Sequence, residues 1–391
     1  MEIQLWWLLA LPLFFALGWV AARIDIKHVV RESRALPRSY FRGLNFLLNE
    51  QPDMAIEAFL EAARVDTETI ELHFALGNLF RRRGEADRAI RVHQNLVERE
   101  GLSDEQRLHA LSELGQDYLK AGLLDRAEDI FLKLRGSARD EEALRFLLEI
   151  YQQEKEWAKA VAVAEAMPSH SDHLWQKDMA EFYCEMASTE LLHGRIAEAR
   201  RLLDEALRCH RKCVRATILQ GDVALQDNQP EAAIEAWQRI EAQNPIYLAL
   251  VAPKLMEAYG RIGRTEQGVQ LLRAYLERHS SLDLLDAVVD AEKEQGGAEA
   301  AYTLVRDELR RNPTLLGLNK LLELQLLSAP PERRDDLELI KNLIHAHTRR
   351  VARYRCDACG FKARQFYWRC PGCGGWETYP PRRTEEFDLT P

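Results

Sequence analysis

The sequence is poor in the residues that mark disordered or fibrous chains. Among its 391 residues there are only 14 prolines and 20 glycines, while 47% are hydrophobic and 29% are charged. This is the composition of an ordinary folded protein rather than of a low-complexity or collagen-like one. A chain of this length exceeds what one compact core needs, so it predicts several domains or one extended array of repeats.

An overall excess of basic charge is also lacking. The formal net charge is −9, which argues against a general nucleic-acid-binding protein, because such proteins carry a basic footprint. The charge is unevenly distributed, since residues 349–383 carry +7 and residues 1–348 carry −13. A basic C-terminal part therefore follows an acidic body.

Motifs of the common enzyme classes are missing. The chain contains no glycine-rich phosphate loop, no His-Glu-x-x-His and no Gly-x-Ser-x-Gly. These patterns bind phosphates, hold a catalytic zinc ion or present a nucleophilic serine. We therefore expect a protein that is not an enzyme.

Cysteine is scarce, and its distribution excludes the framework of a disulfide-stapled secreted domain. There are seven cysteines, four of them clustered near the C-terminus, whereas such frameworks use an even and dispersed set. Cys184, Cys209 and Cys213 lie in helical sequence, where thiols usually serve packing. Cys209 with Cys213, and His170 with His173, have the spacing of metal-ligand pairs, but we interpret neither pair as a metal site.

Charged residues are absent from the 18 residues between Leu5 and Ala22. A helix of that length spans roughly 27 Å, close to the hydrocarbon thickness of a bilayer. Trp6, Trp7 and Trp19 lie near its two ends, as interfacial aromatic residues do. We expect residues 1–22 to form a transmembrane anchor, followed by a basic juxtamembrane linker at residues 23–35.

A cleaved signal peptide is the main alternative for this stretch. It would carry basic residues before the apolar run, but the only charged side chain there is Glu2, and six lysines and arginines follow between Arg23 and Arg42. A buried helix of a soluble core fits less well, because no polar face interrupts the run. By the positive-inside rule, the bulk of the protein is expected on the cytoplasmic side.

A repeat runs through the middle of the chain. At four places a glycine is followed twelve residues later by an alanine, and at three of these a large aromatic residue follows four positions on. The sets are Gly43, Ala55 and Phe59; Gly77 and Ala89; Gly115, Ala127 and Phe131; and Gly221, Ala233 and Trp237. We interpret the small residues as points of close approach between two helices, and the aromatic ring as filling the gap to the next pair.

The spacing of about 34 residues is typical of tetratricopeptide repeats, in which stacked helix pairs share one continuous core. Glycines also recur where the chain must turn between the helices of a pair, at Gly84, Gly122, Gly194 and Gly263. Residues 36–350 can hold about nine such pairs. We predict an all-α, superhelical solenoid with a concave groove for protein segments. An irregular helical bundle is the alternative, but it would not explain the matching offsets.

Near the C-terminus, two Cys-x-x-Cys-Gly knuckles are separated by ten residues, and their cysteines are Cys356, Cys359, Cys370 and Cys373. Four thiolates satisfy one tetrahedral ion and leave no open position, as in structural sites. Soft sulfur ligands suit iron or zinc, between which the sequence does not decide. We predict a metal-binding module at residues 351–381, similar to rubredoxins and zinc ribbons, that folds around its ion. Residues 382–391 are a tail.

Several roles are open for this module. A closed metal clamp without chemistry is favoured over electron transfer, because the link between the knuckles is much shorter than in rubredoxins. Its positive charge predicts docking against the acidic solenoid or an acidic partner, and binding of single-stranded nucleic acid is a weaker alternative. Its six aromatic residues are more than a small core requires, so some are expected to face a partner or the solenoid: Phe361, Phe366, Tyr367, Trp368, Trp376 and Tyr379.

The combination of these features resembles the lipopolysaccharide assembly protein B family, called LapB or YciM, over essentially the whole chain. The solenoid motifs alone are common, but their coupling to an N-terminal anchor and a terminal rubredoxin-like module is specific. The stretches that carry the resemblance include Ser39-Tyr40, Gly43 to Leu48, Gly77 to Phe80, Asp125 to Asp129, Tyr354 to Cys356, Cys359 to Phe361 and Tyr367-Trp368.

The resemblance implies an inner-membrane protein of Gram-negative bacteria, with a single span and its bulk in the cytoplasm. Such proteins restrain lipopolysaccharide synthesis by promoting degradation of the lipid A pathway deacetylase LpxC by the membrane protease FtsH. A sensor of the LapC or YejM type opposes them. It also implies that the four cysteines are metal ligands and that the module contacts the solenoid.

Two other functions stay open at this level, namely a scaffold for lipopolysaccharide synthesis and export proteins and a redox- or metal-responsive sensor. No nucleic-acid partner is expected. Whether the protein forms a homodimer is left open.

Overall fold

The computed structural model describes residues 38–49, 51–65, 70–168, 172–279 and 281–385. The expected anchor at residues 1–22 and the linker at 23–35 lie outside these ranges. None of the helices within them combines the length and the apolar character that a membrane span requires. The chain divides into two compact units, residues 1–150 and 151–391, which are described separately.

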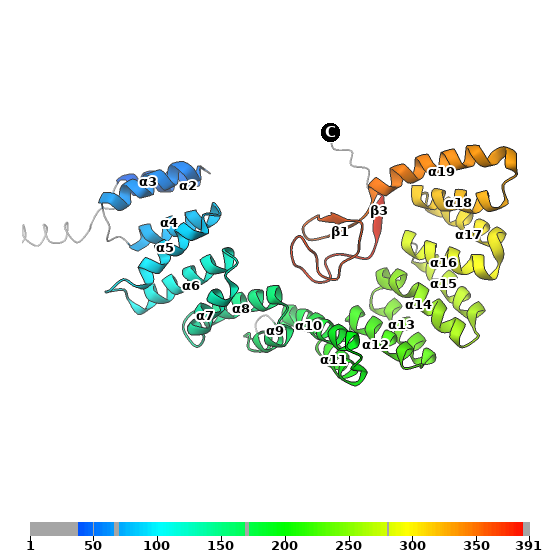
Figure 1. The fold of residues 1–391 in the computed structure, drawn as a ribbon, viewed down its shortest axis with the longest axis horizontal. Coiled ribbons are helices and arrows are strands. Elements are labelled where there is room, and N and C mark those ends of the chain that lie inside the picture. Colours follow the sequence, from blue (N-terminus) through cyan, green and yellow to red (C-terminus); the bar gives the residue numbers. More distant parts are fainter. Residues whose placement is uncertain (1–37, 50, 66–69, 169–171, 280, 386–391) are drawn as a thin grey trace, which may run out of the picture. The chain divides into compact units, whose positions relative to one another are not determined.

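Unit 1 consists of helices packed in consecutive pairs, α2 with α3, α4 with α5 and α6 with α7 (Figure 1). The dividing point between the units lies within α8. The helices are α2 (Arg38–Leu48), α3 (Pro52–Val65), α4 (Ile70–Arg82), α5 (Ala86–Val97), α6 (Asp104–Lys120), α7 (Leu124–Leu134) and α8 (Asp140–Glu154).

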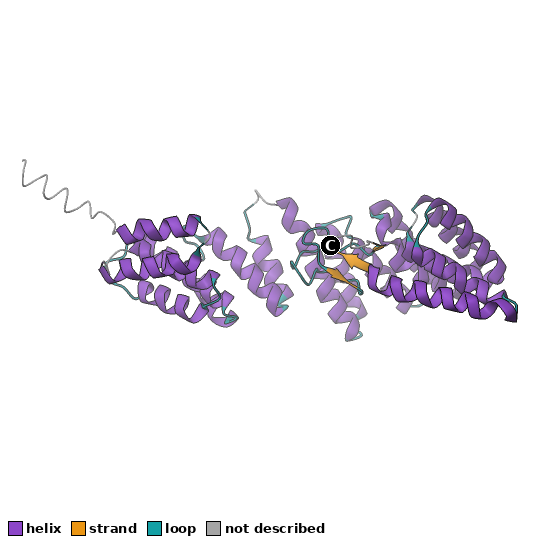
Figure 2. Ribbon diagram, turned by 90° about the horizontal axis from the view of Figure 1, so that it is seen from above, coloured by secondary structure: helices purple, strands orange, loops and turns teal. Residues whose placement is uncertain are grey.

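Unit 2 continues the same pattern and ends in a small β-structure (Figure 2). Its helices are α9 (Trp157–Glu165), α10 (Asp172–Leu192), α11 (Ile196–Cys209), α12 (Val214–Gln226), α13 (Pro230–Gln243), the short 3₁₀ helix η3 (Pro245–Tyr247), α14 (Leu248–Arg261), α15 (Thr265–Arg278), α16 (Leu282–Gln295), α17 (Gly297–Arg311), α18 (Leu315–Ser328) and α19 (Pro331–Val351). The expectation of a mostly helical repeat solenoid is confirmed.

The turns between paired helices depend on glycine. Gly84, Gly122, Gly194 and Gly263 have φ values of 80°, 75°, 72° and 68°, which place them in the left-handed region that only glycine enters at little cost. Each lies just after the last residues of the first helix of a pair, so the sequence expectation for these four turns is confirmed.

The repeated glycines on the first helices lie against the repeated rings of the second helices. A Cβ atom added at Gly43, Gly115 or Gly221 would lie 2.6, 2.7 or 2.1 Å from the nearest ring atom of Phe59, Phe131 or Trp237. The ring therefore fills the space left by the glycine of its own pair. Phe131 also stacks on Phe146 of α8, with ring centroids 4.7 Å apart, so this ring bridges to the next pair as well.

The alanines of the repeat mark the close helix contacts, as expected. Ala55, Ala89, Ala127 and Ala233 are fully buried. Any larger side chain at these positions would push the two helices of a pair apart, because protein interiors are close-packed.

The chain after α19 forms a three-stranded sheet with the order β2-β1-β3. The strands are β1 (Ala352–Arg355), β2 (Lys362–Ala363) and β3 (Arg383–Glu385), and both neighbours of β1 are antiparallel to it. Since Tyr354 pairs with Arg383, the last strand extends the sheet into the segment that the sequence had suggested as a tail.

Candidate metal centre and its docking surface

The two cysteine knuckles have matching backbone geometry. The amide of Gly360 donates to the carbonyl oxygen of Cys356 at 2.9 Å, and the amide of Gly374 donates to that of Cys370 at 2.8 Å. Both glycines have positive φ values, 75° and 70°. Glycine after the second cysteine of each motif therefore lets the backbone curl around the two thiols.

The knuckles bring four sulfur atoms together. The Sγ atoms of Cys356, Cys359, Cys370 and Cys373 all lie within 4.8 Å of one another. Cys356 and Cys370 are buried, whereas Cys359 and Cys373 are exposed. Four convergent soft donors fit one tetrahedral iron or zinc ion, so the arrangement suggests a single metal ion, in agreement with the sequence expectation.

Proton affinities differ sharply within the cluster. Burial raises the pKa of Cys356, but its hydrogen bonds with the Thr378 hydroxyl and with the amides of Cys359 and Ala358 outweigh burial and lower that pKa to about 6. Cys359 behaves oppositely: a hydrogen bond from the amide of Phe361 lowers its pKa, but burial and the three neighbouring thiols raise it to about 12. Without a cation, the first thiolate to form opposes the others, so all four ionise together only around a positive ion.

A buried tyrosine forms the centre of the module. Tyr379 is 1% exposed, and its hydroxyl lies 3.2 and 3.3 Å from the carbonyl oxygens of Tyr354 and Gln365. The rings of Phe361 and Tyr367 surround it, with centroids 6.3 and 5.9 Å away. This accounts for part of the aromatic surplus seen in the sequence.

The side chain of Trp376 projects from the module and packs against helices α9 and α10 of the solenoid. Its ring meets those of Trp157 and Phe182 edge to face, with centroids 6.0 and 6.2 Å away. Only 9% of the residue is exposed. Edge-to-face packing of this kind adds about 0.5–1.5 kcal/mol per pair to the burial itself. Trp376 is therefore one of the anchors that attach the module to α9 and α10.

Trp368 provides a second contact. It stacks on Tyr247 with ring centroids 5.5 Å apart and an interplanar angle of 4°, and Phe366 meets the same tyrosine edge to face. Trp368 and Phe366 pack against the core shared by α12 to α18. The module thus extends a hydrophobic core that the solenoid has already formed.

A buried arginine of the solenoid lies between these two anchors. The guanidinium of Arg215 is 5.5 Å from the ring of Trp368 and 5.9 Å from that of Trp376. It also pairs with Glu181 at 3.2 Å and with Glu185 at 2.8 Å. Arg215 therefore joins two acidic side chains of α10 to the aromatic face of the module.

Arginines of the module complete the contact. The side chain of Arg383 lies 2.5 Å from Asp283 and 2.9 Å from Asp286 of α16, while Arg369 donates to the carbonyl oxygen of Gln152 at 3.1 Å. The basic module thus does meet acidic groups of the solenoid. The contact thus combines these ion pairs and hydrogen bonds with the aromatic packing of Trp368 and Trp376.

Two acidic side chains beside this contact have raised pKa values. Burial and the nearby Glu377 raise the pKa of Asp178 to about 6 against the pull of Arg369. Burial raises that of Glu181 to about 7, because the cost of desolvation exceeds the attraction of Arg215. Both carboxyl groups therefore bind a proton more tightly in the folded protein than they would in water.

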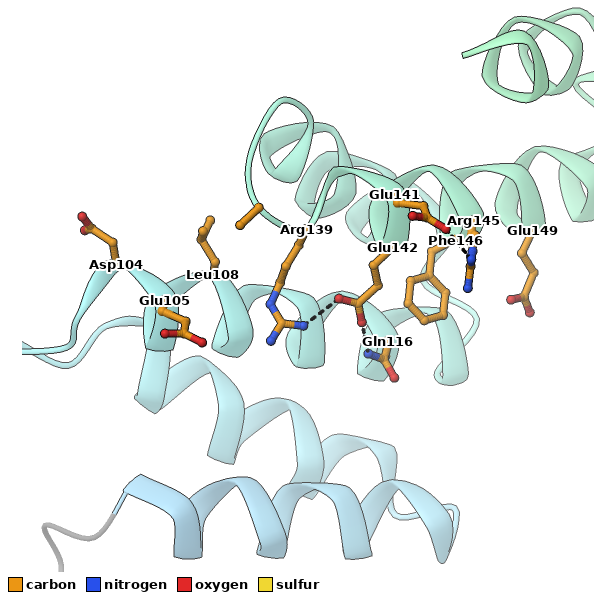
Figure 3. A pocket seen from close by; sticks show the side chains of 11 residues that line it. Asp104, Glu105, Leu108, Gln116, Arg139, Glu141, Glu142, Arg145, Phe146 and Glu149 are labelled. Atoms are coloured by element: carbon orange, nitrogen blue, oxygen red, sulfur yellow. Dashed lines mark hydrogen bonds and ion pairs between the residues drawn. The ribbon is translucent and has the colours of Figure 1, made fainter. Parts of the chain in front are cut away.

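Unit 1 carries a groove of about 980 Å³ between α6 and α8 (Figure 3). Leu108 and Phe146 contribute apolar lining, and most of the charged groups around the groove are acidic. Arg139 pairs with Glu142 at 2.6 Å, and Arg145 pairs with Glu141. The remaining acidic lining comes from Asp104, Glu105 and Glu149.

Sequence reasoning missed His93, which takes the ring position of the second repeat. A Cβ atom at Gly77 would lie 2.3 Å from its Nε2 atom, just as the other repeat glycines face Phe or Trp. His93 is fully buried, and its Nδ1 lies 2.5 Å from Asp117, which also pairs with Arg81. The constant offset of sixteen residues from the glycine would have identified it.

The cysteines outside the module pack in the core. Cys213 lies 3.9 Å from Cys184, and both side chains are fully buried among apolar neighbours. The expected packing role for these two is confirmed, and the neighbour of Cys213 is Cys184 rather than Cys209. His170 lies outside the described residues, as does the side chain of His173.

Two family models match the chain. One, described as a rubredoxin metal binding domain, matches residues 354–381, and a tetratricopeptide repeat model matches residues 184–245. A solved structure of the TPR2AB-domain:pHSP90-complex of yeast Sti1 shares 16% identity, covering 69% of this chain and 95% of that one, with a TM-score of 0.32.

Whole-length relatives are bacterial. Lipopolysaccharide assembly protein B of Escherichia coli strain K12 is 36% identical over 378 residues, which cover 96% of this chain and 97% of that protein. The Haemophilus influenzae protein of the same name is 32% identical over 393 residues, covering 97% of this chain and 98% of its own.

Proposed function

Because this chain belongs to the lipopolysaccharide assembly protein B family, we propose that it is a non-catalytic adaptor in lipopolysaccharide assembly. Residues 1–22 anchor it in the inner membrane, with its bulk on the cytoplasmic side. The adaptor presents the deacetylase LpxC to the protease FtsH, and a sensor of the LapC or YejM type opposes it. The observation that carries the proposal is the whole-length similarity to the family. The aromatic contact between module and solenoid supports it, because it joins the two parts of the adaptor.

The proposed mechanism is proximity. Anchoring confines adaptor and protease to the same membrane, and a solenoid that holds the client raises the client's effective concentration at the protease without new protease contacts. The groove between α6 and α8 (Figure 3) is a candidate surface for the client, since apolar and charged side chains both line it.

In this proposal Cys356, Cys359, Cys370 and Cys373 hold one iron or zinc ion. Four thiolate ligands leave no open coordination position, so the ion would act as a structural clamp rather than as a catalyst. The sulfur cluster shapes the segment that carries Trp368 and Trp376. Metal binding is thereby linked to the surface that the module presents to α9, α10 and η3.

The half-life of LpxC tests this function. Cells depleted of the adaptor are expected to degrade LpxC more slowly, and wild type is expected to restore degradation. The Cys356→Ser variant should not restore degradation, nor should a chain that lacks residues 1–22. Cys209→Ser is the matched control, because this half-buried thiol is not one of the four clustered cysteines. An unchanged half-life on depletion would refute the adaptor function, and full rescue by the truncated chain would refute the proximity mechanism.

Exposure of Cys359 and Cys373 favours one alternative function, a redox- or metal-responsive sensor. Accessible thiolates are the ones that oxidants reach first. This function predicts that mild oxidation releases the ion and lengthens the half-life of LpxC, whereas a structural clamp predicts no response to oxidants until the module unfolds.

A further inference from the structure

The last helix of the solenoid, α19, carries apolar side chains on two opposite faces. Leu337, Lys341 and Ile344 follow one another at helical spacing and are partly covered. Lys341 lies 4.0 Å from Glu323 of α18, so this face is turned toward the solenoid. Leu339 and Leu343 lie on the other side of the helix, and they are 60% and 64% exposed.

This outer face is unusual for the end of a repeat array. Terminal repeats normally have a polar outer surface, because no further repeat covers them. Here Ile340, beside the two leucines, is 46% exposed, and Leu327 near the end of α18 is 53% exposed. No other residues of the described part of the chain cover this face, so it is a surface suited to a partner.

The charges along α19 indicate which partner. Its first half contains four acidic residues and two arginines, and its second half contains three basic residues, two histidines and no acidic residue. Glu332, Asp335 and Asp336 precede Leu339 at the spacing that continues its face, and all three are exposed. Arg349 and Arg350 occupy the last turn of the helix.

We propose that α19 is a self-association surface on which a second copy of this chain docks through its own α19, antiparallel and related by a twofold axis. In such an isologous contact each residue meets its counterpart reciprocally. An axis that crosses the outer face at the level of residue 341 along the helix places Leu339 opposite Leu343 of the second copy. It also places the acidic half of each helix opposite the basic half of the other, which a parallel pair would not do.

The contact is small. A helix of 21 residues is about 30 Å long, so one helix pair falls toward the low end of specific interfaces. The dimer is therefore expected to exchange readily. This inference stands independently of the proposed adaptor function.

The first test compares two double variants of the full chain in density-matched detergent, by sedimentation velocity over a range of protein concentrations. Leu339→Glu with Leu343→Glu should weaken dimerisation more than about tenfold, because four leucines leave the contact. Leu132→Glu with Leu192→Glu makes the same change at two leucines exposed elsewhere and should not alter dimerisation. Equal circular dichroism melting curves show that all chains are folded.

Charge reversal tests the antiparallel arrangement. Asp335→Lys with Asp336→Lys, and separately Arg349→Glu with Arg350→Glu, should each weaken the dimer. A mixture of these two variants should form heterodimers, because every opposing pair of helix halves then carries opposite charges. A monomeric wild-type chain, an unaffected leucine variant, or a mixture that fails to associate would each overturn the proposal. If the surface binds lipid or another protein instead, the wild-type chain should be monomeric and the leucine variant should not differ from it.

Discussion

Trp376 of the metal-binding module and Trp157 of α9 meet edge to face across 219 positions of sequence, with ring centroids 6.0 Å apart. Phe182 completes the site, since its ring stacks on Trp157 at 5.7 Å. The short module, which can bury little surface of its own, thereby shares the core of the repeats. Its attachment and its metal centre are linked through the same segment of chain.

Replacing Trp376 should release this attachment. Trp376→Ala is expected to cost about 3 kcal/mol or more of the free energy of unfolding of unit 2, because a large buried ring is lost and a cavity remains. Hydrogen exchange should increase in α9 and α10. Trp376→Phe retains most of the packing and should lose less than half as much. Exchange in Trp376→Ala that equals that of wild type would show that the contact contributes little.

Removing the metal should have a similar effect. A strong chelator is expected to unfold the module and expose Trp368 and Trp376, because binding of the ion supplies the folding energy of the knuckles. Tryptophan fluorescence should shift to the red, while helix content by circular dichroism changes little. Cys370→Ser should show the shifted spectrum without chelator, and Cys184→Ser should not. An unshifted spectrum after complete metal loss would contradict the proposed role of the ion.

Unit 2 should become less stable as the pH rises through about 6. Burial and Glu377 raise the pKa of Asp178 from 3.8 to about 6 in the folded protein. The folded state therefore binds this proton more tightly than the unfolded state does. Its contribution to stability is fully present below the unfolded pKa and is lost as the pH passes the folded pKa.

Asp178→Asn isolates this contribution, since the amide does not titrate. The stability difference between wild type and this variant, measured by urea unfolding of unit 2 at intervals from pH 5 to pH 8, should change in the direction given above. Most of the change is expected below pH 7. A difference that stays constant over this range would show that Asp178 has an ordinary pKa.

The effect of replacing a helical glycine by alanine on the free energy of unfolding should depend on whether an aromatic ring packs against that glycine. Gly221→Ala should destabilise the protein by about 1–3 kcal/mol, because its Cβ would lie 2.1 Å from the indole of Trp237. Gly260→Ala in α14 meets no atom within 4 Å and should stabilise by up to about 1 kcal/mol through helix propensity. Thermal melts of the two variants check the pair. Equal effects would show that ring contact is not what selects glycine at position 221.

The repeat and the metal knuckles could be predicted from sequence because both are local patterns. Gly43 and Phe59 come into contact because a short turn joins the two helices of their pair. Cys356 and Cys359 belong to one knuckle. Both patterns therefore appear in the sequence as fixed offsets between residues. His93 was missed because its chemistry differs from that of Phe and Trp, although its offset from Gly77 is the same. The groove between α6 and α8 was predicted only as a generic concave surface.

The sequence by itself determined the helical repeat, the turn glycines and the four clustered thiols, since each follows from residue spacing over a few tens of positions. Only the tertiary structure decided how the six aromatic residues of the module divide, with Tyr379 at its centre and Trp368 and Trp376 against the solenoid. It alone paired Arg383 with Asp283, and it alone left Leu339 and Leu343 uncovered. These outcomes depend on which surfaces meet across a hundred or more residues, and no local periodicity encodes that.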